Sequence, residues 1–136
     1  MCADASRRKC DSDATSSAAG SAQAGLRLGV SHCGGGAVVI AVAGELNIGS
    51  SARLEAEFER VELLSPELVI VDLRELGFMD STGPSVVVHA HQRAQRSGWR
   101  FGLVNGSGQV QRLLSLTRVD QTVMLAATPE ELLGER

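Results

Sequence analysis

The stretch "LVIVDLRELGFMDSTGPSVVVHAH", which spans Leu68 to His91, contains the pattern that decides the fold. It begins with a continuous apolar run, Leu68–Leu73, which is typical of a strand buried on both faces. After a short loop, apolar residues recur with the spacing of one helical face, at Gly83, Val86, Val87, Ala90 and Ala94. Pro84 is compatible only with the first turn of a helix, so this helix is predicted to begin near Ser81.

Both sides of this stretch repeat the alternation of strand and helix patterns. The predicted elements are a strand at Leu26–His32, a turn at "CGGG", a strand at Ala37–Gly44, a helix through Leu54, Phe58 and Val61 with Ser50 or Ser51 as its N-cap, the strand and helix above with a stop at Gly98, a strand at Trp99–Asn105, a short helix through Val110, Leu113 and Leu114, an edge strand within "QTVML", and a capped helix from Thr128. In the first helix, Glu55, Glu57, Glu59 and Arg60 are predicted to point away from the core. The order β-β-α-β-α-β-α-β-α predicts an α/β fold with a mostly parallel sheet.

Length and composition limit the classes of function. The chain has 136 residues, which favours one domain, and 43% of them are hydrophobic, which is enough for a core. A formal net charge of −3 and a pI of about 5.6 do not indicate a nucleic-acid binder. No apolar run is long enough to span a membrane. We therefore expect no direct contact with nucleic acid or membrane.

The first 25 residues differ in composition from the rest of the chain. They read "MCADASRRKCDSDATSSAAGSAQAG", which is small, polar and without periodicity, so residues 1–25 are predicted to be a disordered tail and residues 26–136 the domain. A signal peptide is the competing interpretation, but no apolar segment follows "RRK". The protein is therefore predicted to be cytoplasmic.

The cysteines indicate neither a metal site nor a redox motif. Cys2 and Cys10 lie in the predicted tail, and Cys33 precedes three glycines. The number is odd, no C-x-x-C pair exists, and His32 beside Cys33 has no second ligand pair at zinc-site spacing. We predict no metal or cofactor, and the sequence alone offers no support for a redox role.

Asp80, Ser81 and Thr82 lie where the predicted strand and loop meet the helix, at the edge of an α/β sheet that usually holds the site. Any of the three is suitable as an N-cap. Ser81 is alternatively a phosphoacceptor beside a carboxylate, at a helix start whose bare N–H groups favour an anion. A nucleophilic serine is a third interpretation, but only the second glycine of G-x-S-x-G is present, and His89 and His91 lie too far along the helix to act as its base.

The segment "VIVDLRELGFMDSTG" resembles the signature of bacterial STAS-domain proteins, specifically the anti-sigma factor antagonists. "AVAGELN", at Ala41–Asn47, and "WRFGLVNGSGQVQRLLSLT", from Trp99, resemble two further segments of that family in the same order and spacing. The resemblance extends from Leu26 to Leu133. It implies a single STAS-like domain with a mixed, mostly parallel central sheet.

The resemblance also implies a regulatory switch rather than an enzyme. Family members bind an anti-sigma factor when unphosphorylated and thereby release a sigma factor for transcription. The anti-sigma factor is often itself a serine kinase that uses ATP, and a phosphatase restores binding. Carried over to this sequence, the phosphoacceptor is Ser81, and Asp80, Thr82 and Gly83 complete its motif.

Three positions depart from the family pattern. Asn47 replaces an aspartate that usually lies near the acceptor serine. Pro84 replaces an apolar residue, and Arg118 stands where a glycine commonly follows "LT". These departures leave open a second interpretation, a STAS scaffold or constitutive antagonist that is not phosphorylated.

Helical spacing also predicts a partner-binding surface. At about 100° per residue, Ser85 and Val88 share the stripe of Ser81, while Val87, Ala90 and Ala94 turn toward the core. Val88 is therefore predicted to be an exposed apolar residue, and the anti-sigma factor is expected to pack across Ser81, Ser85 and Val88.

Overall fold

The computed structural model describes residues 10–12, 25–106 and 108–133. The strands are β1 (Cys10–Ser12), β2 (Leu26–Cys33), β3 (Ala37–Leu46), β4 (Leu68–Asp72), β5 (Leu76–Met79), β6 (Arg100–Val104) and β7 (Met124–Ala126). The helices are α3 (Ser51–Glu62), α4 (Thr82–Ser97), α5 (Gly108–Leu116), α6 (Val119–Thr122) and α7 (Pro129–Leu133), with a 3-10 turn at Gly34–Gly36. None of these described helices is long and apolar enough to cross a membrane.

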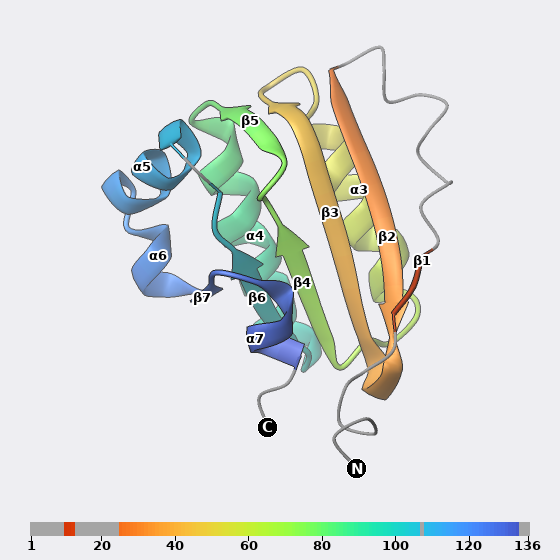
Figure 1. The fold of residues 1–136 in the computed structure, drawn as a ribbon. Coiled ribbons are helices and arrows are strands. Elements are labelled where there is room, and N and C mark those ends of the chain that lie inside the picture. Colours follow the sequence, from red (N-terminus) through yellow and green to blue (C-terminus); the bar gives the residue numbers. More distant parts are fainter. Residues whose placement is uncertain (1–9, 13–24, 107, 134–136) are drawn as a thin grey trace.

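The strands form one mixed sheet in the order β1-β2-β3-β4-β6-β7, with β5 paired to the end of β3 (Figure 1). The β1–β2 and β2–β3 pairs are antiparallel, and the other pairs are parallel. This is the mixed, mostly parallel sheet that the sequence predicts. Parallel pairs require crossover connections. Helix α3 connects β3 to β4, α4 precedes β6, and α5 and α6 connect β6 to β7.

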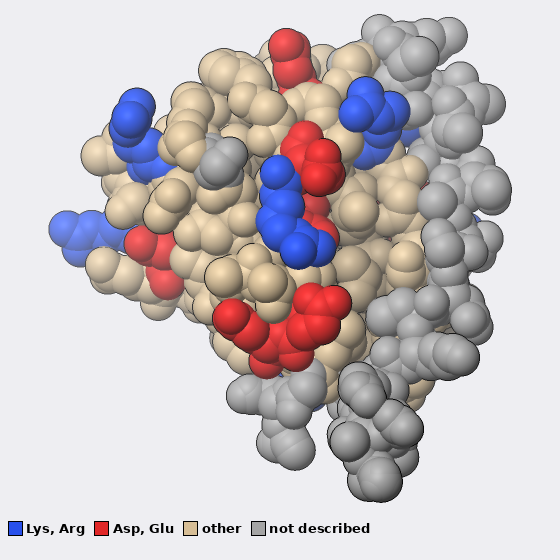
Figure 2. Space-filling model, in the orientation of Figure 1, with Lys and Arg blue, Asp and Glu red and all other residues tan. Residues whose placement is uncertain are grey.

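The helices cover the sheet unequally. Helices α3 and α4 lie behind the sheet in Figure 1, whereas α7 lies in front of β4 and β6. The larger core cluster joins the inner faces of α3 and α4 to the sheet, and a smaller cluster lies beneath Leu132 and Leu133 of α7. The strand β4 is buried on both faces, which explains its continuous apolar sequence. On the face shown in Figure 2, basic and acidic side chains lie among one another.

Most predicted elements are confirmed, and four differences have local causes. The strand β5 was expected to be part of a loop, because four residues with exposed Gly77 and Phe78 carry little periodic signal. The helix α6 occupies part of the segment expected to be an edge strand, and β7 starts only at Met124. The strand β1 lies within the expected tail, whose remaining residues, 1–9 and 13–24, are outside the described residues.

The prediction that Glu57 faces away from the core is wrong. Glu57 is only 8% exposed, although Leu54, Phe58 and Val61 occupy the buried face as expected. Its carboxylate accepts a hydrogen bond from Arg60 Nη2 at 2.6 Å, which compensates the burial of its charge.

A polar cluster around Glu62 joins the end of α3 to the end of α4. The Glu62 carboxylate accepts hydrogen bonds from Ser97 Oγ at 2.5 Å and from Arg93 Nη1 at 3.0 Å. The indole N–H of Trp99 lies 3.5 Å from the same carboxylate. The hydrogen bond from Ser97, followed by those from Arg93 and Trp99, lowers the pKa of Glu62 from its ordinary value of 4.5, although burial opposes the shift. This cluster helps to set the position of α4, which carries the candidate site at its other end.

Because the folded-state pKa of Glu62 is below its ordinary value, its contribution to stability is present above about pH 4.5 and is lost as pH falls through the lowered pKa. We expect Glu62→Gln to lower the melting temperature at pH 7 and to lose this effect in strong acid. Thermal melts of both proteins between neutral and acidic pH test this. The matched control is Glu59→Gln, since the Glu59 carboxylate is 3.9 Å from Arg93 and its side chain is 66% exposed. An equal effect of the two substitutions at every pH would contradict the role of the cluster.

Candidate functional site

The candidate site lies where β5 meets α4, at the end of the sheet toward which the parallel strands run (Figure 1). Ser81 occupies the N-cap position of α4 and is exposed. Its side chain makes no capping hydrogen bond. The sequence suggests Asp80, Ser81 or Thr82 as the N-cap. Ser81 occupies the N-cap position, but its hydroxyl makes no hydrogen bond to the helix.

Asp80 provides the capping interactions instead. Its Oδ1 accepts a hydrogen bond from Thr82 N–H at 2.8 Å, and its carbonyl accepts one from Gly83 N–H at 2.9 Å. Its Oδ2 accepts a weaker hydrogen bond, at 3.3 Å, from Ile48 N–H in the loop between β3 and α3. A single carboxylate therefore fixes the start of α4 and connects it to a loop 32 residues earlier.

These interactions change the expectation of a helix start with bare N–H groups. The N–H groups of Thr82 and Gly83 already have acceptors, and Pro84 has no N–H. The first turn therefore has little capacity left to bind an added anion. A phosphate on Ser81 would not be drawn onto these N–H groups, and it would lie next to the carboxylate of Asp80.

Asn47 lies in the loop that Asp80 contacts, as the family resemblance implies. Its Oδ1 accepts a hydrogen bond from Gly49 N–H at 2.9 Å, and Ser50 Oγ lies 3.3 Å from the same oxygen. Ser50 is fully buried, and its Oγ accepts a hydrogen bond from Asn47 N–H at 3.0 Å. The amide oxygen of Asn47 thus fixes its own turn.

Gly83 has a packing role. A Cβ at this position would lie 2.2 Å from Cγ of Met79, which is fully buried beneath the start of α4. Gln109 fixes the neighbouring backbone from the other side: its Oε1 accepts from Met79 N–H at 3.0 Å, and its Nε2 donates to the Met79 carbonyl at 2.7 Å. The glycine of the Asp-Ser-Thr-Gly motif therefore allows the helix to approach β5 closely.

A surface hollow of about 350 Å³ adjoins Ser81, and we call it the Ser81 hollow. It is lined by Ser81, Pro84, Ser85, Val88, His89, Gln92, Thr117 and Val119. Ser85 is exposed, as predicted, but Val88 is half-buried and packs against the core because α6 approaches this side of α4. The prediction that Val88 is exposed is therefore wrong, whereas Val87, Ala90 and Ala94 face the core as expected.

Two strongly exposed apolar residues flank this region. Ile48, whose N–H contacts Asp80, is 81% exposed, and Leu116, next to Thr117 of the hollow, is 73% exposed. The sequence pattern does not indicate either residue, because the helical stripe through Ser81 lies on α4 alone.

The geometry does not favour a serine hydrolase. His89 lines the Ser81 hollow, but its Nδ1 lies 3.6 Å from Glu55 Oε2 on α3. Among the described residues, no hydrogen bond joins Ser81 to a histidine, and no cluster of three His, Cys, Asp or Glu side chains is suited to a metal ion. A general base within hydrogen-bonding reach of the serine is the first requirement for such chemistry.

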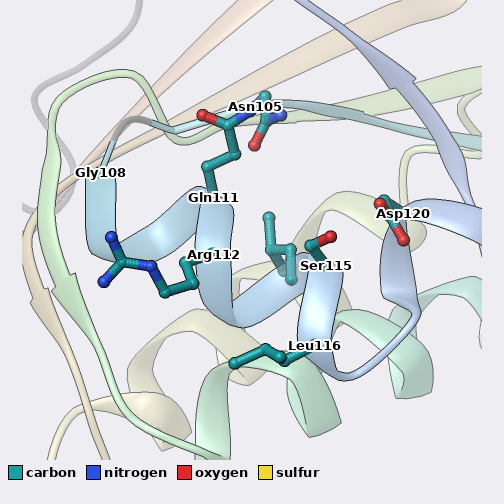
Figure 3. A pocket seen from close by; sticks show the side chains of 8 residues that line it. Asn105, Gly108, Gln111, Arg112, Ser115, Leu116 and Asp120 are labelled. Atoms are coloured by element: carbon teal, nitrogen blue, oxygen red, sulfur yellow. The ribbon is translucent and has the colours of Figure 1, made fainter.

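A second hollow, of about 440 Å³, is lined by Asn105, by residues of α5 and by Asp120 of α6 (Figure 3). Asn105 and Asp120 line it, and an Oδ1 of each is buried without a hydrogen-bond partner among the described residues. Arg118, in this turn, adopts a left-handed conformation with φ of 65°. That conformation explains why glycine suits this position in the family, since a Cβ disfavours it.

The comparison with known protein families decides the classification. The STAS domain family matches residues 31–132. This chain belongs to the STAS domain family. The match includes β3, the Asp80–Gly83 motif and α4, and the sheet and helices described above are those of a single STAS domain.

Individual relatives of this STAS domain are regulators. It is 26% identical over 93 residues to the anti-sigma-F factor antagonist RsfB of Mycobacterium tuberculosis, covering 68% of this chain and 75% of RsfB. A crystal structure of an anti-sigma factor antagonist from Mycobacterium paratuberculosis superimposes with a TM-score of 0.71 and 26% identity, covering 79% of this chain and 91% of that one. The unphosphorylated anti-sigma factor antagonist SpoIIAA shares the fold, with a TM-score of 0.66 and 22% identity over 77% of this chain and 92% of its own.

Asp80→Asn tests whether the carboxylate connects the two loops. The amide retains one oxygen, so either Thr82 N–H or Ile48 N–H would face an NH₂ group instead of an acceptor. We expect a loss of about 1–2 kcal/mol in the free energy of unfolding and faster amide exchange at residues 47–49. Urea denaturation and hydrogen exchange measure these effects. Ser81→Ala is the control and is expected to leave both unchanged, because the Ser81 hydroxyl caps nothing; wild-type stability of Asp80→Asn would contradict this account.

Proposed function

We propose that this STAS domain is an anti-sigma factor antagonist that binds its anti-sigma factor across the surface around Ser81. The observation that carries the proposal is the state of Ser81: exposed, not used for capping, and located on the rim of the Ser81 hollow. The similarity to RsfB and to the Mycobacterium paratuberculosis antagonist supports the same role.

The proposed contact surface combines the Ser81 hollow with the two exposed apolar residues beside it. Ile48 and Leu116 provide apolar area, and Ser85 provides a small exposed surface between turns of α4. Val88 forms part of the floor, since it is half-buried. Asp80, Thr82, Gly83 and Asn47 shape this surface through the hydrogen bonds and packing described above and are proposed to act mainly in this way.

Phosphorylation of Ser81 is proposed to switch binding off. A phosphoryl group adds about −1.5 to −2 charges at neutral pH. The carboxylate of Asp80 would repel it, and the N–H groups of Thr82 and Gly83 already have acceptors. The phosphate would thus remain at the surface, where a partner would have to bury an unpaired charge against apolar residues. The domain itself would need no rearrangement.

The proposal extends to the enzymes that act on Ser81. An anti-sigma factor with ATP-dependent serine kinase activity would add the phosphate, and a phosphatase would remove it, in the cytoplasm. The alternative is a constitutive antagonist or scaffold, which would bind its partner without being phosphorylated. No observation on the site favours an enzymatic role for this chain itself.

The phosphoacceptor is tested by incubation with an ATP-dependent anti-sigma kinase, followed by intact mass and phosphopeptide mapping. We expect one phosphoryl group on Ser81 and none on Ser81→Ala, which retains Thr82. Ser81→Asp should weaken the partner complex by about tenfold or more while its circular dichroism stays native. Phosphate on Thr82 alone would show that the acceptor is misassigned. No phosphate, together with tight binding by Ser81→Asp, would favour the constitutive antagonist.

The contact surface is tested with two matched substitutions on α4. Ser85→Lys adds a charge at an exposed position of the Ser81 hollow, and Gln95→Lys adds the same charge at an exposed position that lines a different hollow with Trp99. Both variants should fold. Ser85→Lys is expected to weaken binding to the anti-sigma factor by about 1 kcal/mol or more, roughly fivefold, and Gln95→Lys to leave it unchanged. Equal affinities in isothermal titration calorimetry would place the partner elsewhere.

A further inference from the structure

Cys33, at the end of β2, is disulfide-bonded. The chain contains three cysteines, at positions 2, 10 and 33, so an intramolecular partner must come from the first ten residues. Cys33 is 7% exposed and packs with Ala37, Val39 and Leu68 in the smaller core cluster. A bond within the chain would attach the N-terminal segment to the body of the domain.

The backbone pairing of β1 with β2 identifies the partner. The two strands are antiparallel, and their register places Cys10 directly opposite Cys33. Directly opposite residues in antiparallel strands have Cα atoms about 4.5–5.5 Å apart, which lies within the usual disulfide range of about 4.4–6.8 Å. We propose that Cys10 and Cys33 form a reversible disulfide that fastens the N-terminal segment to the edge of the sheet.

The disulfide is located where the backbone pairing alone is weak. Among the described residues, three pairs join β1 to β2, from Cys10 with Cys33 to Ser12 with Ser31, whereas β2 pairs with β3 along eight residues. A strand of three residues at a sheet edge gains little from its own pairing. Reduction therefore releases β1 and leaves the outer edge of β2 unpaired at Ser31–Cys33, where a free strand edge is a template for further pairing.

This site is distant from the proposed partner surface along the sheet. Cys33 is paired with Ala37 at the start of β3, whereas β5, which leads to Ser81, is paired with the end of β3 at Gly44–Leu46. The disulfide therefore acts on the N-terminal segment and the β2 edge without occupying the Ser81 hollow. The inference is independent of the proposed function, and its test requires no anti-sigma factor.

The redox step balances with a low-molecular-weight disulfide as oxidant. A thiolate of the pair attacks glutathione disulfide, one glutathione leaves as a thiol, and the second cysteine displaces the other glutathione. Two protein thiols become one disulfide, and one glutathione disulfide becomes two glutathione molecules. In a reducing compartment, disulfides are characteristically transient or redox-sensing, so this bond is proposed to report the thiol–disulfide state of the cell.

The pairing is tested on the full chain equilibrated in glutathione redox buffers, alkylated, and mapped by mass spectrometry without reduction. We expect a Cys10–Cys33 peptide under oxidising conditions in wild type and in Cys2→Ser, and free thiols under reducing conditions. Oxidation should raise the melting temperature by an amount on the order of 5–10 °C, and Cys10→Ser should abolish this shift. A Cys2–Cys33 peptide, or free Cys33 in oxidised glutathione, would overturn the proposal.

Hydrogen exchange tests the release of the edge. Peptides that contain Ser31–Cys33 should exchange more slowly in the oxidised protein than in the reduced protein, and Cys10→Ser should resemble the reduced protein in either buffer. The retained Cys33 in this variant avoids a change in the core, where that residue is packed. Equal exchange of the oxidised and reduced wild type at Ser31–Cys33 would show that the disulfide does not hold β1 in place.

Discussion

The carboxylate of Asp80 is the interaction on which the site depends. It accepts hydrogen bonds from Thr82 N–H at the start of α4 and from Ile48 N–H in the loop after β3. The Asp80 side chain is the hydrogen-bond acceptor for both N–H groups. Ser81, between the strand and the helix, makes no capping hydrogen bond with its own side chain. The proposed phosphorylation switch requires a residue that can be modified without loss of stability, and the absence of a capping hydrogen bond from Ser81 supports that proposal.

One face of helix α4 packs in the core, and the opposite face is the proposed contact surface for a partner. Val87, Ala90 and Ala94 are buried against the sheet, while Ser85 lies at the surface on the side of Ser81. The far end of the helix is fixed by Glu62 of α3 through Arg93 and Ser97. The helix is thus fixed at both ends by polar contacts and along its length by apolar packing. A charge added at Ser81 is therefore proposed to affect the binding of the partner rather than the fold.

The two ends of the sheet have different roles in this account. The end reached by the parallel strands carries Ser81, Ile48 and the turn before α6, where partners and kinases are proposed to act. The opposite end carries the disulfide-bonded Cys33 and the short strand β1. Because β3 spans both ends, phosphorylation and thiol oxidation would affect one domain at separate places. Neither modification would need to rearrange the core.

Most of the strand and helix order, the mostly parallel sheet, the apolar faces of α3 and α4, and the position of the Asp-Ser-Thr-Gly motif could be predicted from the sequence, because each is encoded in local periodicity or in a short motif. The rest is visible only in the tertiary structure: Asp80 rather than Ser81 caps α4, Leu76–Met79 pairs with β3, α6 approaches α4 beside the half-buried Val88, and Cys33 is bonded to another cysteine. The pairing of β5, the burial of Val88 and the bond of Cys33 depend on contacts between residues distant along the chain, and the Asp80 carboxylate likewise reaches Ile48, 32 residues earlier. The spacing of residues along one segment does not show which distant group accepts a hydrogen bond from it or which helix packs against it. Those contacts form only when the helices pack on the sheet.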